Sequence, residues 1–146
     1  MSRRFLFALW LLFAGASAPL AGADDGPGWT MAEDMEGITA FLAARRTEGV
    51  PALVILGVRA CPPCREVYAL VAELPQDLQR RVVGARVDES PDIAEHMPMG
   101  GLPWLIAVAA DGRRVAGVAP MSTDELALLL TAGPPADPAD GAAPSP

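Results

Sequence analysis

Two kinds of apolar pattern alternate along this chain. Short continuous apolar runs are typical of strands that are covered on both faces. They predict strands over 52–58, 82–87 and 104–109. Elsewhere apolar residues recur every three or four positions, which is the spacing of one buried helix side. Together with capping residues, this spacing predicts helices over 30–47, 65–74, 92–97 and 122–131.

Local signals indicate where three of these helices begin. Thr30 and Glu33 fit a capping box, in which each side chain bonds a free N–H of the first turn. Ser90 precedes Pro91, as expected of an N-cap followed by proline at the first helical position. Ser122 opens a polar run that is expected to cap the last helix.

The order of the elements predicts an α/β fold with one mixed central sheet flanked by helices. The strand–helix–strand order favours parallel pairing through a right-handed crossover. Asp111-Gly112 is a hairpin signal, so 113–119 should return as an antiparallel edge strand. The segment 76–81 is expected to be a polar connection.

The first residues are typical of a secretory signal peptide. Arg3 and Arg4 precede the uncharged apolar segment 5–15, and Ala21-Gly22-Ala23 fits a cleavage site. The apolar segment is shorter than the roughly 20 residues that span a bilayer. An uncleaved membrane anchor and a twin-arginine signal are the alternatives, and the ordinary cleaved signal fits better because a residue of the twin-arginine pattern is missing.

The sequence therefore divides into four parts. These are a signal peptide (1–23), a mobile lead-in (24–29), a folded domain (30–131) and a disordered tail rich in proline and alanine (132–146). Without Arg3 and Arg4 the chain has 9 basic and 18 acidic residues, since 11 − 2 = 9, and a net charge of −9. Such a charge argues against nucleic acid as a partner, because nucleic-acid binding needs a basic face.

The chain contains two cysteines, and they lie in Cys61-Pro62-Pro63-Cys64 between a predicted strand and a predicted helix. A disulfide across two residues closes a very small loop, so it constrains little of the unfolded chain. An exported protein also works where disulfides persist. The pair is therefore interpreted as a redox site rather than a structural staple.

Four segments, which follow one another along the chain, resemble segments of the thioredoxin family. They are Cys61-Pro62-Pro63-Cys64, Val87-Asp88-Glu89-Ser90-Pro91, Gly101-Leu102-Pro103 and Asp111-Gly112. The resemblance covers about 50–131 and implies a thioredoxin-like fold. It also implies a cis peptide bond before Pro103, with Leu102 and Pro103 as the platform for an extended substrate.

Three positions depart from the family pattern. Ile55 stands where many thioredoxins have a buried aspartate, Gly84 stands near the position of a lysine, and Ala60 replaces the usual tryptophan. The buried proton acceptor of cytoplasmic-type thioredoxins is therefore not evident. The chain is better described as an exported thioredoxin-like protein.

The expected chemistry follows from the helix that begins at the cysteines. Cys61 at the helix N-terminus should be the exposed attacking cysteine, and the more buried Cys64 should resolve the mixed disulfide. Pro62 and Pro63 have no N–H to donate, so only a moderate lowering of the Cys61 pKa is expected, and this favours reduction. Arg59 and Arg65 are expected to face solvent.

Other residues keep further interpretations open. His96, Met97 and Met99, with the thiolates, offer a soft copper site, which would make the protein a copper-handling module. Tyr68 and Trp104 are interpreted as packing residues.

The favoured interpretation is a periplasmic disulfide reductase without cofactor or metal. Its substrates would be exported proteins with disulfides, for instance in cytochrome c maturation or among metallochaperones. A membrane thiol–disulfide carrier would supply electrons, and the protein would work as a monomer. A disulfide-introducing oxidase is a second alternative.

Overall fold

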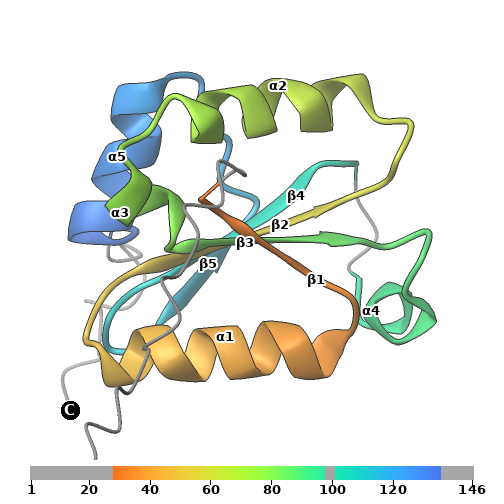
Figure 1. The fold of residues 1–146 in the computed structure, drawn as a ribbon, viewed down its shortest axis with the longest axis horizontal. Coiled ribbons are helices and arrows are strands. Elements are labelled where there is room, and N and C mark those ends of the chain that lie inside the picture. Colours follow the sequence, from red (N-terminus) through yellow and green to blue (C-terminus); the bar gives the residue numbers. More distant parts are fainter. Residues whose placement is uncertain (1–27, 98–100, 136–146) are drawn as a thin grey trace, which may run out of the picture.

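The computed structural model describes residues 28–97 and 101–135. These residues form a mixed sheet with helices on both faces, as expected (Figure 1). The strands are β1 (Thr30–Ala32), β2 (Ala52–Gly57), β3 (Val82–Arg86), β4 (Trp104–Val108) and β5 (Arg114–Ala116). The helices are α1 (Met35–Thr47), α2 (Pro62–Ala72), α3 (Gln76–Gln79), α4 (Pro91–Glu95) and α5 (Thr123–Ala132). Within the described residues, no helix has the length and apolar character needed to cross a membrane.

The central strand of the sheet is β2, in the order β1-β3-β2-β4-β5. The strands β1, β3 and β2 pair in parallel, whereas β4 is antiparallel to β2 and β5 is antiparallel to β4. The expected parallel pair on either side of α2 and the expected hairpin are therefore confirmed. Gly112 in the hairpin turn has a φ of 91°, which glycine adopts without steric cost.

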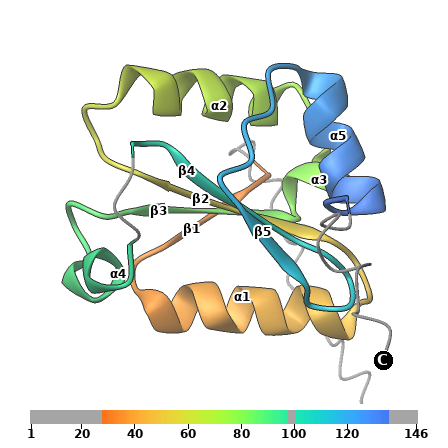
Figure 2. The ribbon, with the colours of Figure 1, turned by 180° about the vertical axis from the view of Figure 1, so that it is seen from behind.

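The two faces of the sheet carry different helices. Opposite views place α2, α3 and α5 over one face and α1 and α4 over the other (Figures 1 and 2). Side chains alternate along β2, so Leu53 and Ile55 enter the core with α2 and α5, while Val54 and Leu56 enter the core with α1. Every residue of β2 is buried, which confirms the prediction of a strand covered on both faces.

The core beneath α2 and α5 holds the elements that carry the cysteines. Leu126 and Leu130 of α5 and Val71 of α2 are fully buried in it. Complete burial of a side chain of this size contributes roughly 1.5–3 kcal/mol. The packing of α5 therefore holds α2 against β2, and the two cysteines lie at the start of α2, where the chain arrives from β2.

The capping box expected at Thr30 and Glu33 is wrong. Thr30 belongs to β1, where it pairs with Val83 of β3. Helix α1 begins later, after Asp34, whose side chain accepts a hydrogen bond of 2.8 Å from the N–H of Gly37. The backbone groups of Thr30–Ala32 form hydrogen bonds with β3 in the sheet, and not the bonds of a first helical turn.

The starts of α4 and α5 agree with expectation in position, whereas α2 begins at Pro62, before the predicted start at 65. Ser122 caps α5 by accepting a hydrogen bond of 3.2 Å from the N–H of Glu125. Ser90 occupies the N-cap of α4, but its hydroxyl donates to the carbonyl of Glu33 instead of capping the helix. The segment 76–81 is more than a polar connection, because it contains α3.

The packed region extends past both expected limits of the domain, 30 and 131. At one end the Trp29 ring stacks on Tyr68, with 4.7 Å between the centroids. At the other end the Arg113 guanidinium donates to the carbonyls of Pro134 and Pro135 at 3.0 and 2.9 Å. The predicted signal peptide (1–23) lies outside the described residues, as does most of the predicted tail.

Candidate active site

Cys61 and Cys64 form a disulfide at the N-terminus of α2, with 5.2 Å between their Cα atoms. Cys61 has extended backbone and is the N-cap, while Pro62 and Pro63 occupy the first helical positions. A proline there loses nothing, because the N–H groups of the first turn have no partner within the helix. The sequence therefore starts the helix directly after Cys61.

One backbone donor reaches the Cys61 sulfur. The N–H of Cys64 donates to Cys61 Sγ at 3.1 Å. Pro62 and Pro63 have no N–H, so the first backbone N–H of the helix is that of Cys64. The sulfur thus takes the place that a serine or aspartate oxygen takes at an ordinary N-cap.

Both sulfur-bearing residues are buried in this disulfide form. Cys61 is 6% exposed and Cys64 is 2% exposed. The order agrees with expectation, but the expected exposed position of Cys61 is wrong for this form, because its sulfur turns back over α2 to cap the helix. Whether Cys61 attacks and Cys64 resolves stays a prediction.

Gly57, the last residue of β2, makes room for the disulfide. A Cβ at this position would lie 3.0 Å from Cys64 Sγ and 3.4 Å from Cys64 Cβ. The first of these distances is shorter than side chains normally allow, so a larger residue would displace Cys64. This close approach fixes the disulfide against the end of the central strand.

A cavity of about 220 Å³ lies beside the disulfide. Its lining residues come from the end of β2, the start of α2 and the end of β3: Gly57, Val58, Arg59, Cys61, Cys64, Arg65, Tyr68 and Arg86. They supply three guanidinium groups and a phenol, and no carboxylate among them faces the disulfide. The cavity is therefore basic in an acidic protein.

Glu89 offsets part of that positive charge. It accepts hydrogen bonds from Arg59, through Nε at 3.0 Å and through Nη2, and from Arg86 Nη1 at 3.3 Å. The hydrogen bond from Arg59 is the main reason why the pKa of Glu89 is lowered. Arg59 and Arg65 are exposed, as expected.

Tyr68 fills space that Gly84 leaves open. Its hydroxyl lies over Gly84, because a Cβ on Gly84 would be only 2.6 Å from the phenol oxygen. Burial raises the pKa of this phenol. Stacking on Trp29 confirms the predicted packing role, but the hydroxyl at the cavity beside Cys64 was missed.

The position of the family's buried acid has no polar group in this protein. Ile55 is fully buried and pairs in register with Gly84, so the two departures from the family pattern are neighbours on adjacent strands. Tyr68 covers this pair from α2. A glycine paired with a buried isoleucine is the sequence signal that could have indicated this contact, because it leaves space for a large side chain from another element.

The peptide bond between Leu102 and Pro103 is cis, which confirms the prediction. Trp104 pairs with Leu56 of β2, so the residue before it lies alongside Gly57, at the end of the sheet from which the cysteine turn leaves. Trp104 packs with the α1 core, as predicted. The role of Leu102 and Pro103 in substrate binding stays a prediction.

The candidate copper ligands are not gathered with the cysteines. His96 lies beside Leu56 on the α1 face of the sheet, and its Nδ1 is 2.7 Å from the carbonyl oxygen of Asp92. Cys64 lies over Gly57, which faces the other side of the sheet. Met99 is outside the described residues, and among the described ones no three His, Cys, Asp or Glu side chains form a metal-binding group.

No protein-family model and no curated protein matches this chain. Solved structures do match. Chloroplastic thioredoxin z is 19% identical over 67% of this chain and 87% of that chain, with a TM-score of 0.56. A mutant thioredoxin from Halobacterium salinarum is 21% identical over 72% of this chain and 90% of its own, with a TM-score of 0.54.

The oxidised form of thioredoxin O2 from Arabidopsis thaliana is 13% identical over 70% of this chain and 92% of that chain, with a TM-score of 0.54. At such identities the similarity establishes the fold. This chain also has the mixed five-stranded sheet, the cis bond before Pro103 and the disulfide at the start of α2. This chain therefore has the thioredoxin fold, with a Cys-x-x-Cys disulfide at the start of α2.

Proposed function

We propose that this protein is a thiol–disulfide oxidoreductase that reduces disulfides in exported proteins. The observation that carries the proposal is the disulfide between Cys61 and Cys64 at the N-terminus of α2. These are the two cysteines of the chain, so the pair can store two electrons as dithiol and release them as disulfide.

The reaction cycle starts from the dithiol. The Cys61 thiolate attacks one sulfur of a substrate disulfide, forms a mixed disulfide and releases the first substrate thiolate, which takes up a proton. Cys64, once deprotonated, attacks the Cys61 sulfur and releases the second substrate thiolate. The substrate gains two electrons and two protons, and the protein is left with the disulfide seen in the structure.

The surroundings of Cys61 support the reducing direction. A single N–H, that of Cys64, lies at the sulfur, and Pro62 and Pro63 add none. Fewer donors stabilise a thiolate less, and a less stabilised dithiol state is a stronger reductant.

The basic cavity acts in the opposite direction, but its effect is reduced. Arg59 and Arg86 both bond to Glu89, so one carboxylate offsets their charge near the disulfide. Arg65 has an exposed side chain and is screened by water. The balance favours a reductase over a strong oxidant.

The segment before β4 is the proposed substrate platform. Leu102 and Pro103 are half-buried and lie at the same end of the sheet as the disulfide. The backbone of Leu102 would pair with an extended substrate segment, a mode of recognition that needs little sequence specificity. Such a platform suits a protein with several exported substrates.

Export and electron supply complete the proposal. The pattern of residues 1–23 supports secretion into the periplasm through a cleaved signal peptide. A reductase there needs a source of electrons, and a membrane thiol–disulfide carrier would regenerate the dithiol by the same exchange chemistry. Amino-terminal sequencing of the protein recovered from a periplasmic fraction tests this point. Residue 24 should be the first, and an intact residue 1 in the cytoplasm would overturn it.

The reduction potential tests the direction of electron flow. Equilibration with a glutathione buffer should give a value closer to that of thioredoxin, about −270 mV, than to about −120 mV, the value of a strong oxidase. Insulin reduction should be lost in Cys61→Ser and kept in Arg80→Ser, a change far from the disulfide. A potential near −120 mV would assign the protein to disulfide formation instead.

Trapping identifies the partners. Cys64→Ser cannot resolve the mixed disulfide, so exported substrates should remain covalently bound to Cys61 on non-reducing gels. The double variant with Cys61→Ser is the control. Equal recovery of proteins from both variants would contradict turnover at Cys61.

A further inference from the structure

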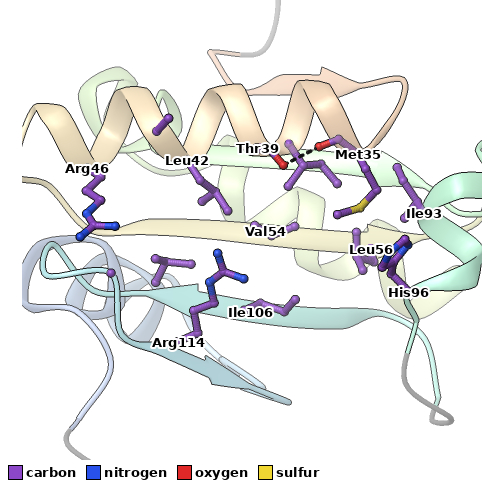
Figure 3. Close-up of a pocket in the computed structure, with 14 residues that line it drawn as sticks. Met35, Thr39, Leu42, Arg46, Val54, Leu56, Ile93, His96, Ile106 and Arg114 are labelled. Carbon is purple, nitrogen blue, oxygen red and sulfur yellow. Dashed lines mark hydrogen bonds between the residues drawn. The ribbon is translucent and has the colours of Figure 1, made fainter.

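The face of the sheet away from the disulfide has a groove of about 470 Å³ between α1 and the strands β2 and β4 (Figure 3). Helix α1 packs over β1, β2 and β3, and α4 contains five residues only. Among the described elements, none on this face covers β4 and β5 (Figures 1 and 2). The groove is the space left beside α1.

Aliphatic side chains form the groove. Val54 and Leu56 of β2 and Ile106 of β4 form its floor, and Ile38 and Leu42 of α1 form one wall (Figure 3). On β2, Val54 and Leu56 alternate with the residues that enter the core under α2 and α5. The groove therefore borders the second core cluster of the protein, which lies under α1. The aliphatic lining favours a ligand with an apolar chain.

Two arginines bring positive charge into this apolar space. Arg46 from α1 and Arg114 from β5 both extend into the groove (Figure 3). The Arg46 guanidinium lies about 3.6 Å from the position of a Cβ on Gly112, so it sits at the hairpin end. Neither side chain bonds or pairs with another described residue, and no carboxylate lines the groove. In a chain with 18 acidic residues, this arrangement selects an anionic group.

Two other polar atoms of the groove already have partners. The Thr39 hydroxyl donates to the carbonyl of Met35 at 2.8 Å, and His96 Nδ1 is 2.7 Å from the carbonyl oxygen of Asp92. A peptide lying here would bury N–H and C=O groups without hydrogen-bond partners, which is costly. An alkyl chain has no such groups, so the lining favours a chain of methylenes over a peptide.

The length of the groove also fits an alkyl chain. Met35 and Arg46 both line it, and because they are eleven positions apart in α1 they lie about 16 Å apart along the helix axis. An extended chain of laurate or myristate is of comparable length. Its carboxylate at Arg46 and Arg114 would leave the chain along Leu42, Ile38 and Leu56.

We propose that this groove binds a single-chain anionic amphiphile, a long-chain carboxylate, with its head group at Arg46 and Arg114. The site is separate from the disulfide and does not depend on the proposed function. It assigns the protein a second ligand class, the free long-chain fatty acids.

Calorimetric titration of the oxidised mature protein with laurate, below the concentration at which laurate forms micelles, tests the proposal. We expect saturable binding of one laurate per chain, and an affinity that falls about fourfold for each methylene removed in shorter carboxylates. Dodecyltrimethylammonium has the same chain and a cationic head, so it should bind at least tenfold more weakly.

Variants locate the site. Arg46→Glu and Arg114→Glu should each weaken laurate binding at least tenfold, whereas Arg80→Glu, an equal charge change outside the groove, should not. Ala43 is exposed and lines the groove, so Ala43→Phe should block binding without disturbing the core. The double change of Cys61 and Cys64 to serine should leave binding unchanged, which separates this site from the redox site.

Three results would overturn the proposal. One is the absence of saturable laurate binding by a folded protein, and another is binding that survives both Arg46→Glu and Ala43→Phe. The third is a different occupant: dimerisation in sedimentation experiments that Ala43→Phe abolishes, or an acidic peptide that binds more tightly than laurate. Either outcome would make the groove a protein interface.

Discussion

The two faces of the central sheet are covered to different degrees. Under α2 and α5 the core is closed, and Leu126 and Leu130 are inaccessible to water. Beside α1 the core is only partly open, because Leu42 and Ile106 are half-buried along the groove while Val54 and Leu56 are buried. The same strand, β2, supplies side chains to both faces, so the difference comes from the helices and not from the sheet.

Because of this difference, the disulfide lies on a rigid face, whereas the groove lies on a face that solvent can reach. The disulfide lies where β2, α2 and the closed core meet, and its geometry depends on a glycine and a well-packed helix. The open face keeps aliphatic surface within reach of solvent, which costs stability but leaves room for a ligand. The molecule therefore carries its disulfide on the closed face and its candidate ligand site on the open one.

The largest expected effect contrasts a leucine from each face. Leu130→Ala removes a fully buried side chain and should lower the free energy of unfolding by about 2–5 kcal/mol. Leu42→Ala, on the half-buried groove wall, should cost about 1 kcal/mol, because water already reaches part of this side chain. Urea denaturation of both variants gives the two values. Equal losses would mean that the α1 face is as closed as the other.

The next effect concerns the contact between the closed face and the disulfide. Gly57→Ala places a Cβ 3.0 Å from Cys64 Sγ, so we expect a loss of about 1–3 kcal/mol from overpacking. Gly101→Ala is the matched control, since nothing lies within 4 Å of its added Cβ. Thermal unfolding of the oxidised proteins should separate them. A Gly57→Ala protein as stable as the control would show that Cys64 can move aside.

A smaller effect compares the N-caps of α1 and α5, one from each face. Asp34→Ala and Ser122→Ala each remove a side chain that accepts from the first helical turn, and each should cost about 1 kcal/mol. Thr30→Ala should cost less, because Thr30 is in an edge strand and caps no helix. Urea denaturation of the three variants checks this order. A larger loss for Thr30→Ala than for Asp34→Ala would restore the capping box that the sequence predicted.

Thr30 also shows what limits prediction from sequence. Long apolar runs and strong caps such as Ser122 predicted β2, β3, β4 and α5 well, because those signals are local. Strand β1 has three residues and exists only through its pairing with β3, so nothing within Thr30-Met31-Ala32 distinguishes it from a helix start. Its detection requires knowledge of a partner some fifty residues away.

The candidate site divides in the same way. The cysteine pair and the helix that follows it were evident from adjacent residues, and the cis bond at Pro103 followed from resemblance alone. Other features depend on how distant elements pack. These are the placement of the Tyr68 hydroxyl over Gly84, the hydrogen bonds from Arg59 and Arg86 to Glu89, and the groove beside α1. Such contacts are decided by tertiary structure, and a residue pattern does not determine them.

The smallest effect at neutral pH is expected at Tyr68, on the closed face beside the disulfide. Its hydroxyl makes no hydrogen bond to the described residues, so Tyr68→Phe should change stability little at about pH 8, where the phenol is neutral in both states. Burial raises the pKa of the folded phenol above its ordinary value of 10.0. The neutral form is therefore favoured in the folded protein, and wild type should lose stability as the pH rises above about 10, where the unfolded phenol ionises first.

The phenylalanine variant has no such group, so its advantage over wild type should appear only in alkaline solution. Urea denaturation of both proteins at about pH 8 and about pH 11 measures the difference, and Tyr68 is the one tyrosine of the chain, so its ultraviolet titration is read without overlap from other phenols. A gap between the proteins that is already large at neutral pH would instead mean that the hydroxyl takes part in a bond at the cavity beside Cys64. The closed face would then extend its polar contacts to the redox site itself.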